Sequence, residues 1–423
     1  MRHFLLIGCV SLLKVALQAQ PIKNVQIPPV AAKYPYNECE PSIAINPRNP
    51  NEIAAGTVLQ GYHISTDGGN TWKSSVLKSP YGVYGDPVLQ YDQTGRLYYF
   101  HLSDYSKTSH LDRIVCQVAD QPGKFSKGSF PKPNGTKVQD KHWVVIDPKT
   151  NVLYMTWTQF DAYDSADPKD TSIIVFSKST DRGLSWTDPI RISKYGGDCL
   201  DGDNTVEGAV PAVGPNGEIF VSWTGPRGIM FQKSTDGGLT WLPEERKLAD
   251  HVGGWDIQIP GIYRANGFPF LMSDMSGGPH NGTLYLNWCD QRNGSDNTDV
   301  WLIKSTDAGQ TWSAPIQVNQ DKDSRHQFLT SMAIDQVRGD LHFVYYDRRR
   351  FKDNRTDVVW ATSKDGGQSF QEQRVSNQPF VPNPMVFFGD YLGIAAHDGH
   401  IRPIWPRMDN NKITLWVGLI DLE

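Results

Sequence analysis

The stretch Ser65-Thr66-Asp67-Gly68-Gly69-Asn70-Thr71-Trp72 decides the fold, because the sequence repeats it four more times with small changes. The shared pattern, Ser-x-Asp-x-Gly-x-Ser/Thr-aromatic, returns at residues 179–186, 234–241, 305–312 and 363–370. In each copy the aspartate can accept hydrogen bonds from turn amides. The glycine that all five copies share two residues after the aspartate suits a positive φ, and the aromatic side chain can anchor the turn on a sheet. A β-rich run lies on each side of a copy, so the octapeptide predicts a hairpin turn with a structural, non-catalytic aspartate.

The spacing of the copies indicates a larger repeat. Their aspartates are 114, 55, 71 and 58 residues apart, and the double-length first gap contains Asp120-Gln-Pro-Gly123-Lys-Phe125, which we interpret as a decayed sixth copy. Upstream of each turn the chain repeats a strand, a tight turn and a second strand ending in an aromatic residue, as in 143–157 and 210–223. Repeated four-stranded units predict an all-β fold, a β-propeller.

The last unit, from Tyr391 to Ile420, has three strands and no closing turn. Residues 23–27 form a spare strand that could complete it and close the ring. We predict seven four-stranded blades, with six as the alternative, because seven gives about 58 residues per blade and six about 67, against a turn spacing of about 60. Residues 20–423 are expected to form this single domain.

Composition excludes several other classes of protein. The chain has 423 residues, 39 % apolar and 11 % aromatic, which is enough to bury a large core and argues against disorder. The 38 glycines and 28 prolines argue against long helices. The net charge of −5 argues against a nucleic-acid partner.

The first 19 residues differ from the rest and resemble a cleavable signal peptide, with an apolar run from Phe4 to Leu13 and a small residue, Ala19, at the expected cut. The alternative is a lipoprotein signal, because residues 6–9, Leu-Ile-Gly-Cys, match a lipobox. Nothing else approaches the ~18 apolar residues of a transmembrane segment. We therefore expect a secreted or periplasmic monomer.

The cysteines and the acidic loops give only weak indications of disulfide bonds or metal sites. The four cysteines beyond the signal are too widely spaced for a zinc site, and they either form up to two disulfides or remain free. The loop with Asp201 and Asp203 could hold Ca²⁺, although a solvated turn is the favoured interpretation, and the acidic loop at Asp161 shares this ambiguity. We expect no other cofactor.

The octapeptide resembles the Asp-box, or BNR repeat, of sialidases and other secreted propellers. Sialidases clamp a substrate carboxylate with three arginines and use a tyrosine nucleophile assisted by a glutamate, with an aspartate as acid/base. The segment that begins at Glu207 is similar to the one that carries the family's glutamate, whereas Gln26-Ile27-Pro28 stands where the family has Arg-Ile-Pro. Trp223 replaces a second expected arginine, and Arg227 follows it. The resemblance implies a sialidase-like glycoside hydrolase acting on an extracellular, anionic glycan.

Propeller geometry locates the candidate site independently. The starts of the innermost strands converge on one face of the ring, opposite the octapeptide turns, and the loops after the second strands lie on that same face. Nearly every predicted strand start is acidic or histidine: Glu40, Asp86, Asp140, His142, Glu207, His326 and Asp390. The second-strand loops and the aromatic residues near them add Trp157, Asp161, Trp223, Arg227, Trp288, Asp290, Arg292, Tyr346, Asp347, Arg348, Arg407 and Asp409.

Four interpretations of this set remain open. A glycosidase needs an acid and a base or nucleophile, which Glu207 could form with Asp86 or Asp390. A polysaccharide lyase needs an arginine and a histidine or tyrosine base, for which His142, His326 and Tyr346 are candidates. A non-catalytic propeller would bind a glycan or a protein on the same face. A ring of structural ion pairs would give the same composition.

Overall fold

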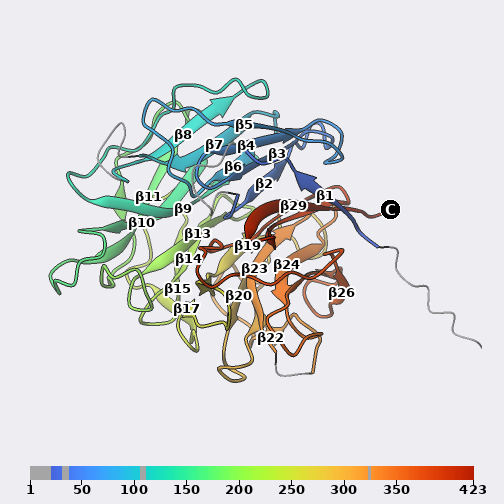
Figure 1. Cartoon of the computed structure of the whole chain (residues 1–423). Helices are drawn as coiled ribbons and strands as arrows, with labels where there is room; N and C mark the ends of the chain where they lie inside the picture. Colours follow the sequence, from blue (N-terminus) through green and yellow to red (C-terminus); the bar gives the residue numbers. More distant parts are fainter. Residues whose placement is uncertain (1–20, 31–37, 105–110, 323–324) are drawn as a thin grey trace, which may run out of the picture.

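The computed structural model describes residues 21–30, 38–104, 111–322 and 325–423. Seven antiparallel sheets surround a common centre, and Figure 1 shows β2, β13, β19 and β23 toward the middle. The first strand of every sheet contacts the first strands of the two neighbouring sheets, so the ring closes. The predicted seven-bladed β-propeller is confirmed.

The strands follow one order, from the innermost strand of each blade to the outermost. Blades one to three are β2 (Ser42–Ile45), β3 (Ile53–Thr57), β4 (Gly61–Ser65) and β5 (Lys73–Val76); β6 (Val88–Tyr91), β7 (Leu97–Leu102) and β8 (Ile114–Ala119); and β9 (Val138–Ile146), β10 (Leu153–Phe160), β11 (Ser172–Ser179) and β12 (Ile190–Arg191). Blades four and five are β13 (Glu207–Val213), β14 (Ile219–Thr224), β15 (Ile229–Ser234) and β16 (Arg246–Ala249); and β19 (Phe270–Ser273), β20 (Leu284–Asp290), β21 (Asp299–Ser305) and β22 (Ile316–Gln317). Blade six is β23 (Gln327–Ile334), β24 (Leu341–Asp347), β25 (Asp357–Ser363) and β26 (Gln371–Arg374), and a hairpin of β17 (Asp256–Ile257) and β18 (Ala265–Asn266) lies between blades four and five in the chain.

The seventh blade joins the two ends of the described chain. It consists of β27 (Gly393–His397), β28 (His400–Asp409), β29 (Lys412–Asp421) and, outermost, β1 (Lys23–Ile27). β1 pairs antiparallel with β29, from Lys23 opposite Leu419 to Ile27 opposite Leu415, and Figure 1 shows the blue strand beside the red one. The predicted closure by an N-terminal strand is confirmed.

The octapeptides connect the third and fourth strands of five blades, as predicted. Each aspartate accepts a hydrogen bond from the serine two residues before it and from the amide and hydroxyl four residues after it. The same serine accepts a bond from the amide of the glycine, which has a positive φ in all five copies. The carboxylate oxygens of these aspartates therefore serve as hydrogen-bond acceptors within their own turns.

The decayed copy behaves differently. Asp120 pairs with Arg96, at 2.6 Å from Asp Oδ1 to Arg Nε, in place of turn amides. Its blade, the second, has three strands, and an isolated bridge between Cys116 and Ser129 takes the place beside β8 where a fourth strand pairs in the other blades. Loss of the octapeptide and loss of the outer strand thus occur together.

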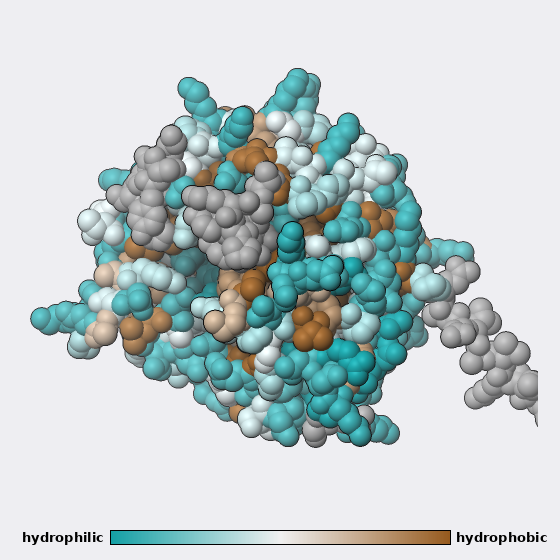
Figure 2. All heavy atoms as spheres, in the orientation of Figure 1, coloured by the Kyte–Doolittle hydropathy of each residue, from teal (hydrophilic) through white to brown (hydrophobic). Residues whose placement is uncertain are grey.

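Hydrophobic cores lie between neighbouring blades, because both faces of each sheet are covered. One such cluster packs Trp223 of β14 with Ile174 and Phe176 of β11, and another packs Trp288 of β20 with Phe231 of β15. The four described cysteines are buried, and no disulfide bond joins any of them within the described residues. Figure 2 shows one largely hydrophilic face with apolar side chains in small, separate patches.

No helix in the described part of the chain is long and apolar enough to cross a membrane. The predicted signal peptide, residues 1–19, lies outside the described residues.

Candidate active site

The strand starts reach the centre because the backbone turns sharply there. Glu40, Asp86 and Lys141 have φ values of 51°, 47° and 48°, and Gly208 follows Glu207 with a φ of 70°. The ladders of β9 with β10 and of β13 with β14 are interrupted by bulges near these positions. A positive φ costs a non-glycine residue about 1–3 kcal/mol, and strain of this kind concentrates at functional sites.

Two cations hold carboxylates from different blades together. The Lys141 ammonium contacts the carboxylate of Asp390 directly and lies 3.5 Å from Glu40 Oε1 and 3.6 Å from Asp86 Oδ1. Arg264, on the loop of the β17–β18 hairpin, donates from Nε to Asp390 Oδ1 at 2.8 Å and from Nη2 to Asp390 Oδ2. Because Glu40, Asp86, Lys141 and Asp390 belong to blades one, two, three and seven, this cluster lies where the innermost strands meet.

The charges of the cluster balance only if some of its acids are protonated. Burial opposes ionisation of Asp390 and Asp86. Nevertheless, Arg264 and Lys141 hold the pKa of Asp390 below its usual range, and Lys141 does the same for Asp86. Burial raises the pKa of Glu40 and Asp140 well above the usual range. Two carboxylates therefore stay ionised beside two cations, while the other acids keep their protons.

Asp86 is the most connected of the ionised groups. The hydroxyl of Tyr391 donates to Asp86 Oδ1 at 3.0 Å, and the protonated Asp140 supplies a second hydrogen bond that lowers the Asp86 pKa. His142, also close to Asp86, is 1 % exposed, and burial lowers its pKa to about 4, so the imidazole is neutral at pH 7. The pair of Asp86 and Asp140 thus holds one proton between two carboxyl groups.

Glu207 is buried without a hydrogen-bond partner among the described residues. Its side chain is 0 % exposed, and neither carboxyl oxygen is bonded. Burial, followed by the nearby carboxyl groups of Asp201 and Asp140, raises its pKa well above the usual range. An unbonded carboxyl group that holds its proton is what general-acid catalysis requires.

His326 has a different environment. Its Nδ1 lies 3.1 Å from Thr298 Oγ1, and burial together with the nearby Arg348 lowers its pKa to about 4. Arg348 is 3 % exposed and donates to Thr356 Oγ1 and the Pro260 carbonyl, but its Nη2 has no partner in the described part of the chain. The convergence of His326 with Glu207, His142 and Asp390 stays a prediction: among the described residues His326 has no hydrogen bond to any of them, and its carbonyl accepts the Arg348 amide at 3.1 Å.

The remaining predicted residues are engaged elsewhere. Trp157 and Trp223 are 2 % and 0 % exposed in the core between blades, so neither ring face is open to a sugar. Tyr346 is equally buried and donates its hydroxyl to the Pro406 carbonyl. The other arginines and aspartates form local pairs: Arg227 with Glu245, Arg292 with Asp290, Asp347 with Arg349, Arg407 with Asp409, and Asp161 with Lys137.

The Ca²⁺ candidates serve other contacts. Asp201 accepts hydrogen bonds from Arg264 Nη1 at 3.0 Å and from Tyr163 at 2.6 Å. Asp203 Oδ1 accepts the Asp256 amide at 2.8 Å. No group of three or more histidine, cysteine, aspartate or glutamate side chains suited to a metal occurs among the described residues.

Sequence reasoning missed three members of the cluster. Lys141 lies between the candidates Asp140 and His142, but lysine is not one of the acidic and histidine residue types on which the candidate set was based. Tyr391 directly follows Asp390 and could have been found in the same way. Arg264 has no such signal, because the hairpin that carries it does not belong to the repeat.

Comparisons with known proteins show the fold. No family model and no curated protein matches the sequence. Among solved structures, an ulvan lyase of polysaccharide lyase family PL25 superposes with a TM-score of 0.52 at 13 % identity, covering 91 % of this chain and 94 % of the other. YCF48 bound to D1 peptide gives 0.51 at 10 % identity and 96 % and 97 % coverage. A mutant of the NanB sialidase from Streptococcus pneumoniae gives 0.50 at 11 % identity and 88 % and 83 % coverage. These likenesses and the seven closed blades show the fold, a seven-bladed β-propeller.

Proposed function

We propose that this propeller is a glycoside hydrolase that acts on an extracellular glycan. Its chemistry would lie in the axial cluster, by which we mean the group of Glu40, Asp86, Asp140, Lys141, Glu207, Arg264, Asp390 and Tyr391. One observation carries the proposal: four buried carboxyl groups gather around Lys141, where cations lower the pKa of Asp86 and Asp390 while burial raises the pKa of Asp140 and Glu207. Hydrolysis of a glycosidic bond needs one of each, an acid for the leaving oxygen and a base or nucleophile for the other side.

The roles follow from the contacts. Asp86 accepts the Tyr391 hydroxyl and is placed to take its proton as the phenol oxygen attacks the anomeric carbon. Glu207 carries no competing hydrogen bond and is placed to give its proton to the leaving oxygen. Water then cleaves the glycosyl–tyrosine bond, with the Glu207 carboxylate taking a proton from that water and Tyr391 recovering its own from Asp86.

An anionic substrate suits the neighbouring group of Arg348. Its Nη2 is buried and unbonded in the described part of the chain, and the charge that it bears has no carboxylate in contact. The loop from Gln258 to Arg264 connects the two groups, since Pro260 contacts Arg348 and Arg264 contacts Asp390. A sugar carboxylate or sulfate on Arg348 would supply the missing partner. Export of the enzyme by residues 1–19 belongs to the same proposal.

The deciding experiment is a screen of purified protein against sialyl, uronate and neutral glycosides, followed by reducing-end release. We expect Glu207→Gln and Tyr391→Phe to lower kcat at least 100-fold, since removing a general acid or nucleophile costs about 10²–10⁴ in rate. Asp409→Asn, a surface change in the Arg407 pair, is the control and should keep wild-type kcat. Hydrolysis that survives Glu207→Gln would contradict the assignment.

A lyase is the second candidate, favoured by the position of His326 near Arg348, whose backbone amide donates to the His326 carbonyl at 3.1 Å. A neutral imidazole near a guanidinium whose Nη2 is unbonded in the described part of the chain is suited to abstraction of a proton next to a uronate carboxylate. In that case uronate substrates should give an unsaturated product that absorbs ultraviolet light, and His326→Ala should abolish it. Reducing ends without that absorbance would favour the hydrolase.

A further inference from the structure

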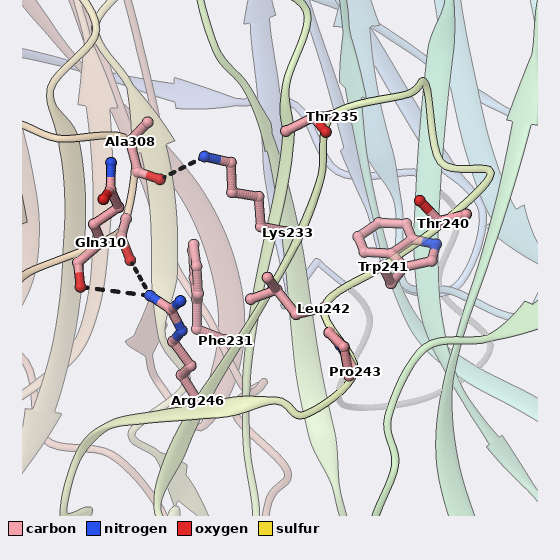
Figure 3. Close-up of a pocket in the computed structure, with 11 residues that line it drawn as sticks. Phe231, Lys233, Thr235, Thr240, Trp241, Leu242, Pro243, Arg246, Ala308 and Gln310 are labelled. Atoms are coloured by element: carbon pink, nitrogen blue, oxygen red, sulfur yellow. Dashed lines mark hydrogen bonds between the residues drawn. The ribbon is translucent and has the colours of Figure 1, made fainter.

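A cleft on the opposite face of the ring is unused by the proposed chemistry. It has a volume of ≈ 280 Å³ and lies between the octapeptide turn of blade four and that of blade five. Figure 3 shows Trp241 on one side, Phe231 in the middle, and Lys233 and Arg246 reaching toward Ala308 and Gln310 on the other. This volume lies just below the ~300–1,000 Å³ of small-molecule sites, so the cleft suits a small ligand or one unit of a longer one.

The cleft is positively charged because its two cations bind only main-chain carbonyls. Lys233 Nζ donates to the Ala308 carbonyl at 3.0 Å, and Arg246 Nη1 lies 3.3 and 3.4 Å from the Gly309 and Gln310 carbonyls. Neither cation forms an ion pair in the described ranges. Lys233 lies 5.5 Å from the centroid of the Phe220 ring and helps to lower the pKa of Glu218, so Arg246 is the cation that keeps its charge for a ligand.

The lysine contact is also part of how the blades join. Lys178 and Lys304 make the same bond to the Gly237 and Gly366 carbonyls of the next octapeptide. The feature that distinguishes the cleft is therefore Arg246, an exposed arginine on β16 whose bonds are long and easily exchanged for a ligand.

Trp241 offers the second half of a sugar site. Its ring is half-buried, packs on Phe176 at 5.0 Å between centroids, and lines the cleft. Its Nε1 is buried and has no hydrogen-bond partner among the described residues, as is also the case for Trp312, so the part of Trp241 that it offers to the cleft is the ring. An aromatic wall opposite an arginine is suited to a sugar that carries an acidic group.

A second hollow extends the site. It has a volume of ≈ 370 Å³, shares Trp241, Leu242 and Pro243 with the first, and is lined by Arg191 on its far side. Arg191 also donates only to main-chain carbonyls, those of Ser193 and Lys194. Successive acidic units of one chain could thus occupy the hollows on both sides of the 241–243 segment.

We propose that this cleft is a non-catalytic binding site for acidic sugar units, carboxylated or sulfated, on the face away from the axial cluster. It would keep a polyanionic glycan attached to the protein independently of catalysis. The proposal does not depend on the reaction that the axial cluster performs.

Calorimetric titration of the full chain with trigalacturonate, its methyl ester and galactose 4-sulfate tests the proposal. We expect the wild type to bind at least one acidic probe, with affinity that falls as salt rises, and to bind the neutral ester at least tenfold more weakly. A preference between the two acidic probes tells whether the carboxylate or the sulfate is the better ligand.

Variants locate the binding. Arg246→Gln should weaken it at least tenfold, and Trp241→Phe, which keeps the turn anchor but makes the aromatic wall smaller, severalfold. Arg355→Gln, an exposed arginine paired with Asp353, should bind as the wild type does. Failure of the wild type to bind either acidic probe, or wild-type affinity in Arg246→Gln, would overturn the proposal.

Discussion

The molecule carries two sets of acidic residues that look alike in sequence and differ in burial and in the groups that set their pKa values. The aspartates of the five octapeptide turns are partly or fully exposed, yet local hydrogen bonds lower their pKa values, to about 2 for Asp236 and Asp307. The acids at the inner strand starts are buried, and burial raises the pKa of Glu40, Asp140 and Glu207. Exposure alone would select the wrong set as functional.

The difference is one of hydrogen-bond supply. Each turn surrounds its aspartate with amides and hydroxyls that stabilise the charge, so the carboxylate has nothing left to offer a substrate. The axial cluster contains two cations and at least five acids, so two positive charges cannot balance every carboxylate, and some of the acids must stay protonated. A group that holds its proton for lack of a partner can give it to a substrate.

The largest effect should come from removing the central cation. Lys141→Met leaves Asp390, Asp86 and Glu40 facing each other in the core, and breaking a buried ion pair in this way costs about 3–5 kcal/mol. Urea denaturation measures the loss. Lys352→Met, at an exposed lysine, is the matched control and should change stability by less than about 0.5 kcal/mol. Equal stability of the two variants would mean that the axial acids need no cation.

The second prediction concerns rising pH. The pKa of Glu207 is raised in the folded state, so its contribution to stability is full below its unfolded value, about 4.5, and is lost as pH rises toward the folded value. The unfolding midpoint of the wild type should therefore fall as the pH rises above about 4.5. Glu207→Gln, which mimics the protonated acid, should fall less over the same range. Parallel curves for the two proteins would show that Glu207 does not titrate there.

The turn aspartates should respond at the opposite end of the pH scale. The pKa of Asp307 is lowered by the hydroxyl and amide of Thr311, so its stabilisation is full above about 4 and is lost as pH falls through about 2. At pH 7, Asp307→Ala should cost about 1 kcal/mol, the usual net value of a small number of hydrogen bonds. The difference from the wild type should vanish near pH 2, and a difference that persists there would contradict the account.

The smallest effect should appear at the decayed turn. Asp120 makes an exposed pair with Arg96 and none of the turn bonds of the other copies, so Asp120→Ala should cost less than about 0.5 kcal/mol. Denaturation of this variant beside Asp307→Ala tests whether the stabilising element is the complete octapeptide or the aspartate alone. Equal losses would favour the aspartate alone.

The fold could be predicted from the sequence because its repeat is local. Five octapeptides fix the hairpins, their spacing favours seven blades, and the unpaired 23–27 segment indicates how the ring closes, all of which the structure confirms. The strand starts were also found by counting along the repeat. Lys141 and Arg264, the cations that hold these acids together, could not be identified from the sequence. Nothing in their local sequence distinguishes a lysine in a bulge or an arginine in an inserted hairpin from a cation on the surface.

The second-strand residues show the limit from the other side. Trp157, Trp223 and Tyr346 occur at positions that the repeat places near the site, but each turns into a core between blades. A β-strand alternates the faces that its side chains cover, and the bulges near the inner strand starts shift this alternation by amounts that the sequence pattern does not reveal.

The most direct test compares one residue from each set of acids in a single assay. Using the glycoside that the wild type cleaves best, kcat/KM is measured for Glu207→Gln and Asp307→Ala at a temperature at which both remain folded. We predict a loss of at least about 100-fold for Glu207→Gln and a change of less than about twofold for Asp307→Ala. Wild-type kcat/KM in Glu207→Gln, or equal losses in the two variants, would contradict the assignment of function to the axial cluster.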